Sequence, residues 1–89
     1  MLIVSYDIAD DLVRSRFARM LTKYGAIRLQ YSVYEVLNTS RVMENLLIII
    51  QDYSKHFTPA DSVVVFDVQR DKLVKYGNAI HRDEDIVFL

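Results

Sequence analysis

The sequence of 89 residues contains no cysteine, a single proline and only two glycines. Without cysteine the chain can form no disulfide and offers neither a thiolate metal site nor a thiol nucleophile. The absence of disulfides is typical of cytoplasmic proteins. It also lacks a Gly-rich phosphate loop, a Ser-His-Asp arrangement and a zinc signature. His56 and His81 have no partner at ligand spacing, so we assign neither to metal binding nor to acid–base work.

Long hydrophobic runs are missing as well. The longest uninterrupted apolar run, Leu46 to Ile50, is far too short to span a bilayer, so we expect no membrane segment. No basic segment precedes the apolar N-terminus, so a signal peptide is not expected and Met1 is interpreted as the mature start. A content of 52% hydrophobic and 26% charged residues is typical of a globular protein, and the length predicts one domain over residues 1–89.

Hydrophobic periodicity predicts a strand followed by a helix at the N-terminus. Leu2 to Tyr6 is a short apolar run that ends at Asp7, as in a strand buried on both faces. Asp10 or Asp11 can cap the following helix, and Gly25 stands where such a helix should end. The apolar stripe of this helix comprises Val13, Phe17, Met20, Leu21 and Tyr24.

The next stretch, Ile27 to Leu37, is rich in β-forming residues that alternate with polar ones. The alternation breaks at Glu35 and Val36, which indicates either a bulge or a bend between two short strands. Because no Gly or Asn-Gly turn signal is present, both interpretations stay open.

The second half predicts another helix and another strand. Thr39 or Ser40 can cap a helix that runs to about Tyr53. Its wide apolar face comprises Met43, Leu46, Leu47, Ile50 and Tyr53, broadened by Val42 and Ile49. A loop with the single proline separates it from a buried strand at Val63 to Val68. Two helices alternating with a small sheet predict an α+β, ferredoxin-like βαββαβ sandwich with the helices on one face.

The C-terminus combines an acidic segment, Asp83 to Asp85, with four apolar residues, Ile86 to Leu89. An apolar tail frays unless something ties it down, and an exposed sheet edge can accept it as a strand. We therefore predict that residues 83–89 form an additional C-terminal strand that is exchanged or paired across a homodimer.

Charge is distributed unevenly although the net charge is only −1. From Leu12 to Tyr34 there is no acid, and the cations are Arg14, Arg16, Arg19, Lys23 and Arg28. A helical wheel places Arg16, Arg19 and Lys23 on one flank of the apolar stripe and Arg14 on the other. A nucleic-acid duplex could meet this line of cations. Ordinary solvated helix charges are the alternative interpretation.

Asp7 is the most informative acid, because it closes a buried strand directly before a helix. Its carboxylate should lie at the edge of the sheet where functional groups often gather. The alternative is a helix-capping or turn role, for which Asp10 and Asp11 are better placed. One carboxylate binds Mg²⁺ weakly, but a twofold dimer would present two copies of Asp7.

An ordered set of motifs resembles the small CRISPR-associated endoribonuclease family. The motifs are Tyr6-Asp7-Ile8, Arg14 with Arg16, Lys23-Tyr24-Gly25, Arg28, and Gln30-Tyr31-Ser32-Val33-Tyr34-Glu35. The family usually has phenylalanine where this sequence has Tyr34, a change that keeps the ring. The similarity covers most of the chain and is densest from residue 6 to residue 35.

The resemblance implies a homodimer in which Asp7 is the catalytic residue and the ligand of Mg²⁺, or of another divalent cation such as Mn²⁺. It implies metal-dependent endonuclease cleavage of RNA or DNA. It also implies CRISPR adaptation, in which the dimer bridges integrase subunits on duplex DNA during spacer acquisition. A catalytically inactive DNA-binding adaptor and a toxin-type endoribonuclease of similar fold are the alternatives.

The same resemblance makes Arg14, Arg16 and Arg28 candidate nucleic-acid contacts, to which the helical wheel adds Arg19. Tyr6 and Tyr34 become candidates for support of the site or of the dimer interface. Tyrosines in such apolar surroundings more often pack than stack on bases.

Overall fold

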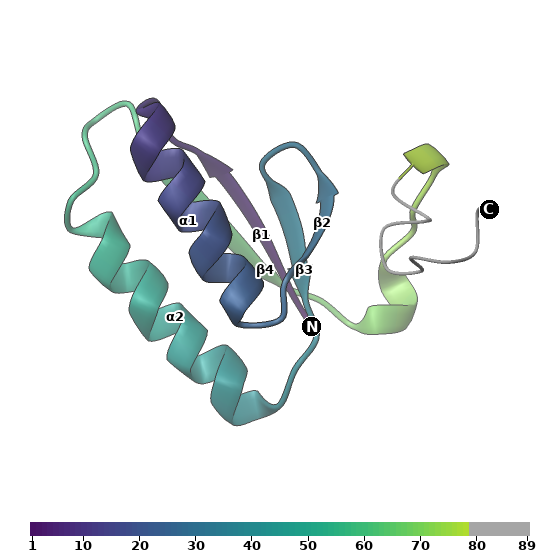
Figure 1. Ribbon diagram of the computed structural model, residues 1–89. Coiled ribbons are helices and arrows are strands. Elements are labelled where there is room, and N and C mark those ends of the chain that lie inside the picture. The colour runs from purple at the N-terminus through teal and green to yellow at the C-terminus, as the bar shows by residue number, and fades with distance from the viewer. Residues whose placement is uncertain (79–89) are drawn as a thin grey trace.

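The computed structural model describes residues 1–78. Within them, two helices cover one face of a four-stranded antiparallel sheet of order β2-β3-β1-β4 (Figure 1). The strands are β1 (Leu2–Asp7), β2 (Ile27–Gln30), β3 (Val33–Val36) and β4 (Ser62–Asp67), and the helices are α1 (Asp11–Lys23) and α2 (Ser40–Ser54). A 3-10 turn, η1 (Arg70–Lys72), follows β4. This order confirms the predicted ferredoxin-like α+β fold. The predicted C-terminal strand at residues 83–89 lies outside the described residues.

Both helices begin where the capping residues predict, and α1 also ends where Gly25 predicts. The Asp10 side chain accepts a hydrogen bond of 2.9 Å from the Val13 amide, and the Thr39 hydroxyl accepts one of 3.2 Å from the Val42 amide. Each bond satisfies an amide that the first turn of a helix leaves unpaired. After α1 the chain reverses at Gly25, whose φ of +85° lies in the region that glycine adopts most easily.

The β-rich stretch after α1 is a hairpin and not one bent strand. Residues 31–32 form the turn, Gln30 pairs with Val33, and Ser32 has a φ of +63°. The expected break at Glu35 and Val36 is wrong, because both residues lie within β3. The alternation changes earlier, since the register shifts between Arg28 and Gln30 and the turn follows directly. A turn that uses serine at positive φ gives no glycine signal in the sequence.

The core lies between the helices and one face of the sheet. Strands β1 and β3 contribute alternate side chains to it, and the helices contribute their apolar stripes. Its members are Leu2, Val4, Tyr6, Ile8, Phe17, Met20, Leu21, Ala26, Tyr34, Val36, Leu46 and Ile50. Leu47, which we expected on the apolar face of α2, is 42% exposed because it lies on the flank of the helix.

The other face of the sheet, which we call the outer face, is open at one end. On β1 this face carries Ile3, Ser5 and Asp7, which pair with Phe66, Val64 and Ser62 of β4. The expectation of a buried strand at Val63 to Val68 is wrong for this face of β4, because Val64 is 50% exposed and Phe66 is 51% exposed. No element within residues 1–78 covers these two side chains fully.

The segment after β4 covers another part of the outer face. Glu35 of β3 lies opposite Ile3 on this face and is only 6% exposed. The Lys75 ammonium lies 2.6 Å from the Glu35 carboxylate, so residues 68–78 reach β3 across the sheet. Figure 1 shows this segment apart from α1 and α2. The part that residues 1–78 leave open is therefore the β4 side of the outer face, next to Asp7.

Candidate functional site

Asp7 ends β1 with an exposed side chain. It pairs with Ser62 and shares the strand parity of Ile3 and Ser5, so its carboxylate belongs to the outer face. Residues 1–78 contain no group of three or more His, Cys, Asp or Glu side chains that could hold a metal ion. Since Mg²⁺ is commonly held by one or two carboxylates together with waters and phosphate oxygens, the single Asp7 fits such a site only as a partial donor set.

Arg14 fixes the loop that follows Asp7. Its guanidinium donates a hydrogen bond of 2.9 Å to the Ile8 carbonyl and a second bond to the Asp11 carboxylate. The hydrogen bond with Asp11 raises the pKa of Arg14 above its ordinary value. The side chain is 26% exposed. The predicted nucleic-acid contact of Arg14 stays a prediction, and its hydrogen bonds to Ile8 and Asp11 give this residue a local role in positioning the loop.

Asp61 holds the same loop from the other side, and sequence reasoning missed it. Its carboxylate accepts a hydrogen bond of 2.9 Å from the Ala9 amide and another of 2.9 Å from the Thr58 amide. These bonds lower the pKa of Asp61 below its ordinary value, because they favour the charged form. An aspartate two residues after the only proline is typical of a turn, which was the available signal.

Tyr6 and Tyr34 form a buried aromatic pair beneath a small niche. Their rings stack with centroids 6.1 Å apart, and Tyr6 also meets Phe17 edge-on at 5.0 Å. Burial, followed by the proximity of Tyr34, raises the pKa of Tyr6 to about 12. The Tyr6 hydroxyl is therefore neutral near pH 7 and can donate a hydrogen bond but cannot serve as a base.

The niche itself has a volume of about 140 Å³ and brings several predicted residues together. Its lining comprises Tyr6, Arg14, Ser15, Ala18, Arg28, Tyr31, Ser32 and Tyr34. The Arg28 guanidinium lies 5.9 Å from the ring centroid of Tyr31, which is 68% exposed, so a cation and an aromatic face meet at the rim. Four predicted site residues thus share one hollow beside the hairpin, whereas Asp7 lies on the outer face.

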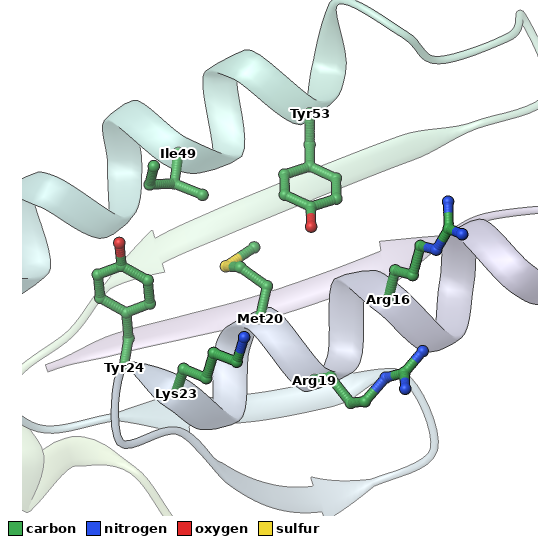
Figure 2. A pocket seen from close by; sticks show the side chains of 7 residues that line it. All are labelled: Arg16, Arg19, Met20, Lys23, Tyr24, Ile49 and Tyr53. Atoms are coloured by element: carbon green, nitrogen blue, oxygen red, sulfur yellow. The ribbon is translucent and has the colours of Figure 1, made fainter.

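The remaining predicted cations lie elsewhere, along a groove between α1 and α2 (Figure 2). The groove has a volume of about 460 Å³ and is lined by Arg16, Arg19, Met20, Lys23, Tyr24, Ile49 and Tyr53. Arg16, Arg19 and Lys23 come from one flank of α1. The helical-wheel prediction that separates these three residues from Arg14 is confirmed.

The fold and these sites define a small ferredoxin-like domain with an aspartate at the end of its first strand and a basic first helix. The chain belongs to the Cas2 family of CRISPR-associated proteins, whose family model, described as CRISPR associated protein Cas2, matches residues 1–76. A search of curated proteins found no match. Membership in the family confirms the resemblance drawn from the motifs and implies a role in CRISPR adaptation. In the described part of the chain, each helix is too short or too polar to cross a membrane.

Proposed function

We propose that this chain is a Mg²⁺-dependent endonuclease that acts as a homodimer and bridges integrase subunits on duplex DNA during spacer acquisition. The observation that carries the proposal is the position of Asp7 at the open end of the outer face, next to exposed apolar side chains. The other parts of the proposal rest on membership in the Cas2 family.

The outer face suits a twofold interface. Val64 and Phe66 are each about half exposed, and they lie on the strand that pairs with β1 at Asp7. In a twofold dimer the same patch of both copies meets, so two outer faces would cover these side chains and bring two copies of Asp7 together. Burying the exposed half of Phe66, about 100 Å², contributes about 2.5 kcal/mol per copy.

The chain's own residues would prepare this site for phosphodiester hydrolysis. The paired Asp7 carboxylates would hold Mg²⁺ or Mn²⁺, which when bound neutralises developing phosphate charge and orients the attacking water. Arg14 and Asp61 fix the loop after Asp7 from two sides, and so limit the positions its carboxylate can take. Away from Asp7, at the rim of the niche, Arg28 offers its guanidinium to a phosphate, and the neutral Tyr6 packs beneath it.

The test of catalysis is a cleavage assay of wild type and Asp7→Asn with and without Mg²⁺ or Mn²⁺. Asp7→Asn removes charge without changing shape, so cleavage should be lost while dimerisation and duplex binding stay nearly intact. Asp52→Asn, an exposed carboxylate of α2, is the matched control. Equal cleavage by the Asp7→Asn variant would remove Asp7 from the mechanism.

A catalytically inactive adaptor is the second candidate, favoured because residues 1–78 contain no group of three or more potential metal ligands. Wild type that binds duplex but never cleaves with either metal would support it.

The dimer is tested separately by sedimentation of Phe66→Gln. The matched control is Ile48→Gln on α2, where the isoleucine is 58% exposed. Loss of about 2.5 kcal/mol from each copy should weaken the dimer on the order of 10³-fold in the Phe66 variant, and the control should dimerise like wild type. Equal dimerisation of both variants would show that the outer face is not the interface.

A further inference from the structure

The groove between α1 and α2 combines cations with aromatic rings. Of the described residues that line it, three are cationic, two are tyrosines, two are apolar, and none is acidic. Its volume of about 460 Å³ lies within the range of ligand-binding clefts. The helices separate it from the outer face, where Asp7 lies. Binding of a duplex would explain the cations but not the tyrosine rings beside them.

We propose that this groove binds unpaired nucleotides of a single nucleic-acid strand, with phosphates on the cationic rim and bases against the tyrosine rings. This site shares its cations with the proposed duplex contacts, adds the tyrosine rings to them, and does not depend on the metal site. Single-strand sites generally join a positively charged track for the backbone with aromatic platforms for the bases, and both parts are present here.

The rim follows the axis of α1. Arg16, Arg19 and Lys23 stand at i, i+3 and i+7, so the first and last are separated along the helix by about 10 Å. This span exceeds a single phosphate group and suits successive phosphates of one strand. Figure 2 shows the cationic side chains extending from α1 beside the hollow. A free inorganic anion would use only one end of such a rim.

The floor offers two partly buried tyrosine rings. Tyr53 reaches in from α2 and Tyr24 from the end of α1, with Met20 between them (Figure 2). Tyr53 packs edge-on against the buried Phe17 at 5.5 Å. The Tyr24 carbonyl accepts a hydrogen bond of 3.1 Å from the Asn38 side chain. Both tyrosines are partly buried, so little ordering remains to be lost when a base stacks on them.

A duplex cannot use this floor. Paired bases are stacked on each other and present only their edges and the backbone, so a duplex can reach the cations but not the rings. The tyrosines therefore separate the two kinds of ligand: changing a ring affects an unpaired strand alone, whereas changing a cation affects both.

The test uses fluorescence anisotropy of the full chain with an oligothymidylate of about ten nucleotides and with a hairpin duplex of similar charge. Tyr24→Leu should weaken oligothymidylate binding about 10-fold and leave duplex binding unchanged. Tyr24→Phe keeps the ring and should bind like wild type. Tyr76→Leu, at a tyrosine that is 81% exposed in the segment after β4, is the matched control and should also bind like wild type.

A variant at the rim gives an independent measurement. Lys23→Gln should flatten the salt dependence of oligothymidylate binding by about 0.7 in logarithmic slope, as expected for one lost phosphate contact. The proposal is overturned if Tyr24→Leu binds the oligothymidylate as tightly as wild type. It is also overturned if this variant loses the same amount of affinity for the oligothymidylate and for the duplex. The proposed cleavage and this site fail separately, because Asp7→Asn should bind oligothymidylate normally.

Discussion

The ion pair between Glu35 and Lys75 gives the sharpest prediction about stability. Glu35 is 6% exposed, and the Lys75 side chain is 17% exposed. Replacing Lys75 with methionine keeps the length of the side chain but leaves the Glu35 carboxylate with no opposite charge at 2.6 Å. Breaking a buried pair in this way costs about 3–5 kcal/mol, and the partial exposure of Lys75 puts the cost at about 3 kcal/mol. For a domain of this size the thermal midpoint should fall by about 12–24 °C.

The assay is a thermal melt of Lys75→Met, of Glu35→Gln and of the double variant. Removing both charges leaves no buried ion, so the double variant should be more stable than Lys75→Met. Lys72→Met, at an exposed cation of the same segment, is the matched control and should melt like wild type. Equal midpoints for the two lysine variants would refute the reasoning and would mean that residues 68–78 do not hold the outer face in solution.

Three further predictions concern residues around the sites. Replacing Arg16 and Arg19 with alanine should weaken duplex binding and flatten its salt dependence by about two units of slope. Identical slopes for variant and wild type would show that both residues are ordinary solvated helix charges. Arg14→Ala should instead leave that slope unchanged and lower the thermal midpoint, because its guanidinium is bonded to the Ile8 carbonyl and to Asp11; a reduced slope would show that Arg14 contacts phosphate. Asp61→Asn should destabilise the protein at pH 7. The pKa of Asp61 in the folded state lies below its ordinary value of about 3.9, so the stabilisation is complete above that value and is lost as the pH falls through the folded-state pKa. Thermal melts at pH 7 and pH 3 should therefore differ more for wild type than for the variant, and an equal difference would contradict the assignment.

Local patterns were sufficient to predict most of the fold. Asp10 and Thr39 are side chains that can bond a free amide at a helix start, and Gly25 can take the positive φ that ends one, so helix boundaries follow from residue type alone. The hairpin was harder to predict. Ser32 adopts a conformation that its residue type does not favour, and the turn is supported by a hydrogen bond of 3.1 Å from the Tyr6 amide, which is distant in sequence.

The candidate site was predictable only where a single element carries it. Spacing on one helix separates Arg16 and Arg19 from Arg14, so a helical wheel was sufficient. The role of Asp61 depends on a bond to Ala9 across 52 positions of sequence, and no local pattern reports such a bond. The exposure of Phe66 likewise depends on which face of the sheet the helices cover.

Asn38 connects the two helices in a way that bears on any attempt to redesign the groove. Its side chain donates to the Tyr24 carbonyl at the end of α1 and accepts from the Thr39 amide at the start of α2, at 3.1 Å and 2.8 Å. A Cβ at Gly25 would stand 3.0 Å from the same side chain, so even an alanine there would crowd this junction. The Asn38 side chain thus joins the backbones of the two helices at this end, without using the side chains that line the groove. Engineered changes of the lining side chains should therefore alter which ligands the groove prefers, while the width of the groove at this end stays the same.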